Sequence, residues 1–317
     1  MPPLMLISAL VLLGVFALLA GALLLFTYVL ARRLLRPIRK PMMVSPADVG
    51  LEMEVVRIPG PRGALAGWYL PASNGCMLIC CHGIHDNSSQ WLPQIARLHA
   101  QSGYGALLFD FTGHGQSDGS QVTYGIRERH DVTAAMEYLR QRGDVPMERV
   151  AILGYSLGAI TAVLAAAEHP DLRAVAIESG FSDLFHDIAK IFTRYTNLPA
   201  FPFANLVIFW GQRIAGVRLS EIRPAQVIGR IAPRPVLIIS DLRDALADEP
   251  HDGEFLYQSA GEPKELWQVA EATHVNAFGV EPEAWIEHVR GFLDTCFAQG
   301  ARPAKQARQA RPTGQGA

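Results

Sequence analysis

Net charge is almost absent from this sequence of 317 residues. Its 28 lysine and arginine residues nearly balance 30 aspartate and glutamate residues, so the formal net charge is -2 and the isoelectric point is near 6.6. A protein that binds nucleic acid needs an excess of positive charge to contact the phosphate backbone. The charge balance therefore gives no reason to expect nucleic acid as a partner.

Cysteine is scarce, with four residues in the whole chain. Cys80 and Cys81 are adjacent in an apolar run that predicts a strand, where successive side chains point to opposite faces and cannot easily pair. Cys76 and Cys296 have no partner at a recognisable spacing, and neither C-x-x-C nor a Cys/His zinc pattern occurs. We expect small buried thiols in a reducing compartment and no metal ion.

Charged residues are missing from Leu4 to Leu30, where most positions are Leu, Ala, Val, Ile or Phe. As a helix, this run would reach about 40 Å, which exceeds the roughly 30 Å hydrocarbon core of a bilayer. The stretch therefore predicts a helix that can span a membrane with some tilt.

The flanks of this run indicate which kind of membrane segment it is. A secretory signal has a basic region before its apolar stretch, but here only Met-Pro-Pro precedes it. The basic residues follow it, which predicts an uncleaved single-pass anchor with the rest of the chain in the cytoplasm. These residues are Arg32, Arg33, Arg36, Arg39 and Lys40.

Apolar runs that alternate with helical patterns predict one α/β domain after the anchor. We assign 1–40 to the anchor and its basic flank, 41–50 to a linker, 51–297 to the domain and 298–317 to an unstructured tail. The expected fold is a mostly parallel eight-stranded sheet flanked by helices, with a hairpin at one edge and a helical cap at about 181–230 over the carboxyl ends of the strands. The expected strands are 51–58, 64–70, 76–81, 106–109, 150–154, 175–177, 235–240 and 265–269.

The stretch from Val150 to Gly158 carries the most specific motif. It is an apolar run that ends in Gly154-Tyr155-Ser156-Leu157-Gly158, and an apolar helical pattern follows at once. In a strand–turn–helix context, G-x-S-x-G places a serine hydroxyl at the tip of a strained turn, at the N-terminus of a helix. We interpret Ser156 as a nucleophile.

A serine hydroxyl needs a base to take its proton and an acid to orient that base. His274 is the best candidate base, because it follows the last expected strand and lies at the same end of the sheet as Ser156. The acid is expected after the penultimate strand, where Asp244 is the first choice, Asp241 the second and Asp248 the third. The chain order serine, aspartate, histidine matches the α/β-hydrolase order.

The backbone N–H groups of Leu157 and Ile84 are the expected oxyanion donors, since one follows the nucleophile and the other lies in the loop after an early strand. Gly83, His85 and Tyr155 are assigned to substrate binding. The glycine-rich stretch from Gly113 to Gly119 departs from G-x-G-x-x-G and opens no helix, so it predicts no dinucleotide site. We expect it to shape the rim of the site, where His114 is a weak candidate for substrate contact.

Together these residues resemble the α/β-hydrolase superfamily, in particular serine-aminopeptidase-like and related membrane-anchored bacterial hydrolases. The segment Asp110 to Gly119 is similar to the family pattern D-x-R-G-H-G-x-S-D/E-G, and the likeness extends over about 51–297. It implies Ser156 as nucleophile, Asp244 as acid and His274 as base. The chain departs at Thr112, where the family usually has arginine, and at Asp241, where it usually has glycine, so the choice between Asp241 and Asp244 stays open.

The leading hypothesis is a membrane-tethered serine hydrolase that cleaves a carboxylic ester through an acyl-enzyme, without a cofactor. A small-molecule or lipid-like ester is the expected substrate, because the cap is rich in apolar residues. The alternatives are a peptidase of the aminopeptidase type, in which Glu178 or Asp183 would bind an amine, an acyltransferase with the same triad, and a non-catalytic membrane-anchored interaction protein.

Overall fold

The computed structural model describes residues 3–246 and 251–298. The third candidate acid, Asp248, lies outside the described residues, as does the expected tail except for Ala298.

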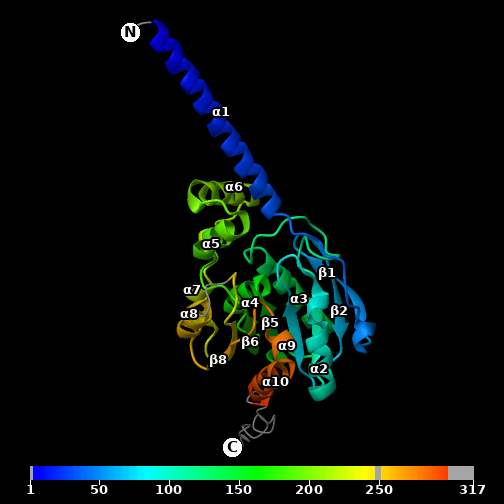
Figure 1. The fold of residues 1–317 in the computed structure, drawn as a ribbon. Helices are drawn as coiled ribbons and strands as arrows, with labels where there is room; N and C mark the ends of the chain where they lie inside the picture. The colour runs from blue at the N-terminus through cyan, green and yellow to red at the C-terminus, as the bar shows by residue number, and fades with distance from the viewer. Residues whose placement is uncertain (1–2, 247–250, 299–317) are drawn as a thin grey trace, which may run out of the picture.

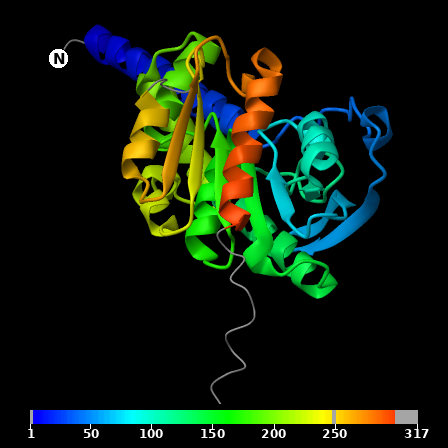
Figure 2. The ribbon, with the colours of Figure 1, turned by 90° about the horizontal axis from the view of Figure 1, so that it is seen from below.

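An eight-stranded sheet forms the centre of the domain, in the order β1-β2-β4-β3-β5-β6-β7-β8. β1 pairs with β2 and β2 with β4 in antiparallel fashion, whereas all other neighbours are parallel. Figure 2 shows the β1–β2 hairpin at one edge and β8 near the other. The predicted mostly parallel sheet is confirmed. The strands are β1 Glu54–Gly60, β2 Gly63–Leu70, β3 Met77–Cys81, β4 Gly105–Phe109, β5 Val150–Tyr155, β6 Ala174–Glu178, β7 Val236–Asp241 and β8 Lys264–Val269.

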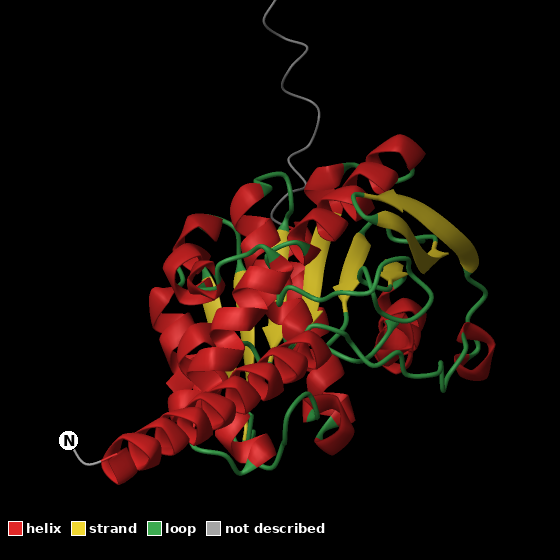
Figure 3. Cartoon of the chain, turned by 90° about the horizontal axis from the view of Figure 1, so that it is seen from above, coloured by secondary structure: helices red, strands yellow, loops and turns green. Residues whose placement is uncertain are grey.

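Side chains alternate between the two faces of the sheet, and each face is covered by helices (Figure 3). Ile79, Ile152 and Val175 pack into the same apolar cluster as residues of α3 (Glu128–Arg142), α4 (Leu157–Glu168) and α8 (His251–Ser259). Leu78, Leu153 and Leu237 pack with residues of α2 (Leu92–Ser102) and α10 (Pro282–Ala298). The continuous apolar pattern of these strands follows from this double burial.

The same alternation explains the cysteines. Cys81 belongs to the cluster under α3 and α4, and Cys80 to the cluster under α2 and α10. All four cysteines are buried and free. Burial raises the pKa of the Cys80 and Cys81 thiols, so both stay neutral and pack as small apolar groups.

The connection between β6 and β7 is helical and contains the cap. It consists of α5 (Leu184–Thr196), a π-helical turn (Ala200–Ala204), α6 (Asn205–Ala215) and α7 (Pro224–Val227), with 3₁₀ turns at Leu219–Glu221 and Ile228–Ile231. Further short elements are α9 (Ala277–Val280) and 3₁₀ turns at Pro46–Val49, Ser88–Trp91 and Met147–Arg149.

The first helix, α1 (Pro3–Leu34), projects from the domain beside α5 and α6, far from the end of α10 (Figure 1). It is long and apolar enough to span a membrane. Its inner end packs on the cap: Thr27 and Ala31, one turn apart, are buried. Two edge-to-face aromatic pairs extend this contact, with ring centroids 6.3 Å apart in Phe26–Phe203 and 5.5 Å apart in Tyr28–Trp210.

Candidate active site

Ser156 occupies the tight turn between β5 and α4. Its backbone has φ 51° and ψ −111°, a conformation that non-glycine residues rarely adopt. Only hydrogen fits at the flanking positions: a Cβ on Gly154 would lie 2.3 Å from the carbonyl oxygen of Gly158, and a Cβ on Gly158 would lie 2.1 Å from that of Cys81. The two glycines of the motif are therefore required by close backbone approach, and they let the turn hold Ser156 at the N-terminus of α4.

His274 lies in the loop after β8, and Asp244 in the loop after β7. The Nε2 atom of His274 is 2.8 Å from the hydroxyl of Ser156, and its Nδ1 atom is 2.5 Å from Oδ2 of Asp244. In the tautomer that satisfies both contacts, Nδ1–H donates to the carboxylate and Nε2 accepts from the serine. The structure thus brings together three side chains from the ends of three parallel strands, as the sequence pattern predicts.

The two candidate acids have different surroundings. The second oxygen of Asp244 accepts a 2.7 Å hydrogen bond from the backbone N–H of Leu246, which orients its carboxylate toward His274. Asp241 ends β7 and is buried, where it accepts from the hydroxyl of Ser179 at 2.6 Å and the N–H of Asn276 at 3.4 Å. Of the two, only Asp244 hydrogen-bonds to His274.

Asp241 belongs instead to a buried carboxyl pair with Glu178 that lies under the His274 loop. Glu178 accepts from the N–H of Ala277 at 3.1 Å and from the indole of Trp285 at 2.8 Å. Burial, reinforced by the negative charge of neighbouring carboxylates, raises the pKa of both Glu178 and Asp241. The pair therefore tends to retain a proton that two isolated carboxyls would have lost.

This pair and Ser179 bind the three backbone N–H groups that follow His274. Val275 donates to Ser179 at 2.8 Å, and the next two residues donate to Asp241 and Glu178. The sequence does not predict this role, and Glu178 was expected only as one of two residues that would bind an amine in the peptidase alternative. An acidic residue at the end of an apolar strand next to the nucleophile could have indicated a buried carboxyl that accepts hydrogen bonds. Which backbone N–H groups it accepts from depends on the fold.

The two expected oxyanion donors border the same cavity as Ser156. Leu157 is the first residue of α4, where a backbone N–H has no acceptor within its own helix. Ile84 lies in the loop after β3, next to Gly83, whose own N–H donates to the side chain of Gln90 at 2.9 Å. The N–H of Gly83 is thereby occupied, and Ile84 and Leu157 stay the predicted donor pair.

The cavity over Ser156 has a volume of about 690 Å³ and mostly apolar walls. Two of its charged lining residues, Lys40 and Asp86, pair with each other at 3.3 Å. The walls come from α1, α4, α5, α6 and the loops around them, and include Leu34, Ile38, Ile160, Phe181, Leu184, Ile188, Ile191, Phe192, Val207, Ile208 and Leu219.

The residues assigned to substrate binding divide into two groups. Gly83 and His85 border the cavity, and Nδ1 of His85 accepts a 3.0 Å hydrogen bond from the N–H of Ile38. Tyr155 does not reach the cavity. Its ring is buried and stacks on Trp91 at 3.7 Å between centroids, because the residue before the nucleophile points to the other face of the sheet.

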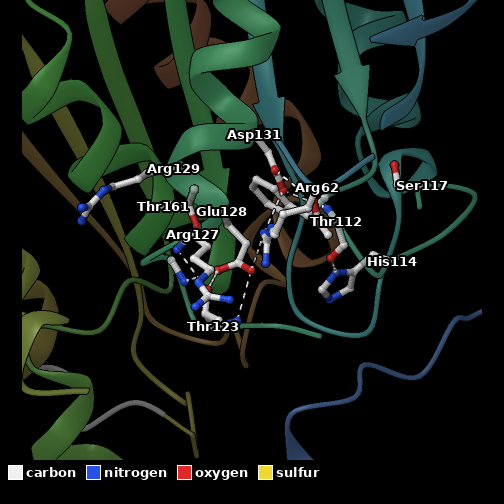
Figure 4. Close-up of polar contacts among 12 residues, drawn as sticks. Arg62, Thr112, His114, Ser117, Thr123, Arg127, Glu128, Arg129, Asp131 and Thr161 are labelled. Atoms are coloured by element: carbon white, nitrogen blue, oxygen red, sulfur yellow. Dashed lines mark hydrogen bonds and ion pairs between the residues drawn. The ribbon is translucent and has the colours of Figure 1, made fainter. Parts of the chain in front are cut away.

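His114 is buried and contacts the carbonyl of Thr112 rather than the cavity. Burial lowers the pKa of His114, so its ring is neutral. Thr112, at the position where the family usually has arginine, bonds to Asp131 on α3 through its N–H and its hydroxyl, both at 2.9 Å. Arg62, in the β1–β2 turn, lies between Glu128 and Asp131, 3.2 Å and 3.5 Å from their carboxylates (Figure 4).

Glu128 connects this cluster to the cavity wall. Its carboxylate accepts from the N–H of Thr123 at 3.1 Å, from the hydroxyl of the same residue at 2.8 Å and from the N–H of Gly125 at 2.9 Å (Figure 4). Thr123 and Tyr124 both line the cavity. The buried carboxylate therefore holds the segment that forms one side of the site.

Within residues 3–246 and 251–298, no group of three or more His, Cys, Asp or Glu side chains is placed to hold a metal ion. The described side chains offer a hydroxyl, an imidazole and a carboxylate, and the backbone offers N–H donors.

Known proteins resemble this chain in sequence and in fold. The model of the X-Pro dipeptidyl-peptidase (S15) family matches residues 67–203. The uncharacterized protein YfhR of Salmonella typhimurium is 30% identical over 224 residues, which cover 68% of this chain and 71% of YfhR. The uncharacterized protein Rv2307c of Mycobacterium tuberculosis is 28% identical over 293 residues, which cover 90% and 95% of the two chains.

Among solved structures, the Pyrococcus furiosus esterase Pf2001 superposes with a TM-score of 0.68 at 24% identity, covering 82% of this chain and 97% of the esterase. This likeness concerns the fold. The sheet, the serine turn at the end of β5 and the sequence relatives agree, and the chain belongs to the α/β-hydrolase superfamily.

Proposed function

We propose that this protein is a membrane-anchored serine hydrolase that cleaves carboxylic esters through an acyl-enzyme. The observation that carries the proposal is the continuous chain of hydrogen bonds from Ser156 through His274 to Asp244. A nucleophile, a base and an orienting acid in this order are what acyl transfer to a serine requires. The apolar cavity above them supports an apolar acyl group as the part of the substrate that is recognised.

Acylation begins when the hydroxyl of Ser156 attacks the ester carbonyl and its proton passes to Nε2 of His274. The negative charge of Asp244 stabilises the imidazolium that forms, and the N–H of Leu246 keeps the carboxylate in the orientation that this requires. The N–H groups of Ile84 and Leu157 stabilise the oxyanion, with support from the positive end of α4. The C–O bond of the ester then breaks, and His274 returns the proton to the leaving alkoxide.

Deacylation uses the same groups in reverse. Water loses a proton to Nε2 of His274 as it attacks the acyl carbon, and the intermediate collapses to a carboxylic acid and free Ser156. The reaction consumes one water and yields one acid and one alcohol, so it needs no cofactor. An acyltransferase would use the same first half-reaction with an acceptor other than water.

A peptidase on the same triad is the second candidate, favoured by the match to the X-Pro dipeptidyl-peptidase family model. The two carboxylates considered for an amine site do not favour it. Glu178 is fully buried and bonded to Trp285, and Asp183 pairs with Arg223 at 3.4 Å. Neither borders the cavity over Ser156.

The membrane anchor and its orientation complete the proposal. The length and apolar character of α1 support a single span. Basic residues from Arg32 to Lys40 at its inner end support a cytoplasmic catalytic domain. A C-terminal reporter fusion tests this orientation. Fluorescence of a GFP fusion is expected, whereas activity of an alkaline phosphatase fusion would show that the catalytic domain lies on the other side of the membrane.

Labelling with a fluorophosphonate probe tests the catalytic part. The full-length protein is expected to become labelled, and Ser156→Ala to lose the label, whereas no labelling of a folded wild-type protein would favour the non-catalytic alternative. Matched p-nitrophenyl esters and X-Pro p-nitroanilides then separate the two enzymatic candidates. Ester turnover without anilide turnover is the expected result.

A further inference from the structure

The inner end of α1 is a wall of the cavity that contains the nucleophile. Ala31, Leu34 and Leu35, from the last turns of α1 and just after it, line the cavity, as does Ile38 in the following segment. Ala31 is 1% exposed and Leu35 is 6% exposed, so both pack firmly against the domain. A helix that served only as a tether would have no reason to reach the site.

The opposite wall comes from the cap, with Ile188 and Ile191 of α5 and Val207 and Ile208 of α6 among its residues. Ser156 and His274 border the same cavity. Leu34 and Ile38 line it and are nevertheless 40% and 66% exposed, so the cavity reaches the surface beside α1. One apolar path thus leads from the nucleophile to the base of the membrane-spanning helix.

Hydrogen bonds hold the end of α1 in this position. The N–H of Val122 donates to the carbonyl of Leu35 at 2.9 Å, and the hydroxyl of Tyr124 to that of Leu34 at 3.1 Å. The guanidinium of Arg39 donates to the carbonyls of three residues in the loop after β4, at 3.2, 2.6 and 2.7 Å. The orientation of the site relative to the helix, and hence to a bilayer around it, is therefore built into the fold.

The outer surface where α1 meets the cap has the character of a membrane interface. Phe26, Phe201 and Phe209 are 48%, 79% and 42% exposed, although soluble domains usually bury such rings. Tyr28 and Trp210 pack beside them, and aromatic residues of this kind concentrate at the boundary between lipid and water. The guanidinium of Arg32 lies over the ring of Tyr28 and that of Arg213 over the ring of Phe209, so cations accompany these aromatic residues.

From this arrangement we infer that the substrate is a membrane lipid ester with one long acyl chain, and that the chain enters the cavity directly from the bilayer between α1 and the cap. The inference deepens the proposed function and rests on it. The carbonyl lies at Ser156 while the chain lies along Ala31 and α6. A volume of about 690 Å³ is typical of a pocket for a single ligand, which favours one acyl chain over two.

Chain-length kinetics test the inference with full-length protein in phosphatidylcholine vesicles and p-nitrophenyl esters from butyrate to palmitate. The wild-type kcat/KM is expected to rise by up to about fourfold per methylene until the cavity is filled. Ala31→Phe fills the cavity from α1, so the palmitate-to-butyrate ratio of kcat/KM is expected to fall at least tenfold. Leu18→Phe, at a 73% exposed position farther out on the same helix, is the matched control and keeps the wild-type ratio.

The outcomes separate this inference from the proposed function. Butyrate turnover with no gain for longer chains, or an unchanged ratio in folded Ala31→Phe, overturns the inference while ester hydrolysis stands. Absence of turnover for every ester, together with absence of fluorophosphonate labelling, rejects both.

A second experiment needs no variant and stays decisive if Ala31→Phe does not fold. A long-chain alkyl fluorophosphonate with a diazirine at the chain end is reacted with the wild-type protein and then irradiated. Its chain is expected to cross-link to peptides that contain residues 31–38 or 188–208. Cross-links confined to other peptides would overturn the inference.

Discussion

The hydroxyl of Ser179 accepts a 2.8 Å hydrogen bond from the backbone N–H of Val275, the residue that follows His274. Val275 has φ 55°, which is rare for a β-branched residue, so the loop is held in a conformation it would not adopt alone. The same hydroxyl donates to Asp241. The position of the imidazole thus depends on a buried polar layer under it as well as on Asp244.

Removing this hydroxyl is expected to affect turnover more than binding. In Ser179→Ala, Val275 loses its acceptor and Asp241 loses one of its donors. At about 1 kcal/mol for each of these two hydrogen bonds, kcat is expected to fall by up to about 30-fold. We expect KM to change less than about twofold. Steady-state kinetics on a short ester measure both quantities.

Ser73→Ala is the control, because Ser73 is exposed and the contact of its hydroxyl with the carbonyl of Gly103 is long, at 3.4 Å. A Ser179→Ala variant with raised KM and unchanged kcat would contradict the positioning role.

The two acids at the end of β7 are expected to differ in kinetic importance. Asp244→Asn removes the charge that stabilises the imidazolium and disturbs the tautomer of His274, so kcat is expected to fall by about 10³ to 10⁴. Asp241→Asn keeps an acceptor for Ser179, and we expect a loss of less than about 30-fold because it acts only through the loop. Turnover of a short ester by the two variants measures this, and the reverse order would reject Asp244 as the acid.

The buried carboxyl pair predicts a pH-dependent stability. Burial raises the pKa of Glu178 from its ordinary 4.5 to about 8. Between these two pH values the folded state therefore binds more protons than the unfolded state. This stabilising contribution is complete below pH 4.5 and is lost as the pH rises toward 8. Glu178→Gln cannot titrate, so its thermal unfolding temperature is expected to fall less over that range, although its amide loses one acceptor at every pH.

Thermal unfolding of both proteins in the same detergent between pH 4.5 and 8.5 measures the difference. The relative loss expected for the wild type is at least about 1 kcal/mol, or about 2 to 4 °C. Parallel curves for the two proteins would show that Glu178 does not carry the effect.

Two arginines near the β1–β2 turn offer a test of burial in ion pairs. Arg62 neutralises Glu128 and Asp131, whose side chains are fully buried, so Arg62→Ala is expected to destabilise the protein by about 3 to 5 kcal/mol at pH 7. Arg57 and Asp118 are each about half exposed at 3.8 Å, so Arg57→Ala is expected to cost less than about 1 kcal/mol. Denaturant unfolding measures both, and equal losses would contradict the argument.

Acid should reduce the defect of Arg62→Ala. Burial raises the pKa of Asp131 to about 6 even with Arg62 beside it. Without the guanidinium, protonation becomes easier still, so the cost of the substitution is expected to shrink as the pH falls from 7 to 5. A cost that is independent of pH over this range would show that the lost contact is mainly one of packing.

Local sequence patterns predict the strands, the serine turn and the position of the catalytic histidine candidate in this protein. Continuous apolar runs such as 76–81 and 150–154 mark strands covered on both faces, and the glycines around Ser156 mark a turn that only hydrogen can fill. His274 could be located because parallel strands of one sheet end at the same edge. These features depend on spacing within a few residues, which a sequence displays directly.

Other features depend on contacts between distant segments. Asp241 and Asp244 lie in the same short stretch, and only the packing of Ser179 and the loop after β8 assigns them different partners. Tyr155 sits inside the motif yet faces the core. Thr112 and Arg62 both contact Asp131 although they are 50 residues apart in the chain, and no local pattern connects those positions.

The first helix, α1, shows this division most plainly. Composition alone determined that α1 is apolar enough for a bilayer, because transfer into lipid depends on the summed character of about 20 residues and not on their neighbours. A run that is apolar on every side has no face that marks a partner. Only the tertiary structure decided that Ala31 and Leu35 close the cavity over Ser156, since that contact depends on the cap and on loops far along the chain.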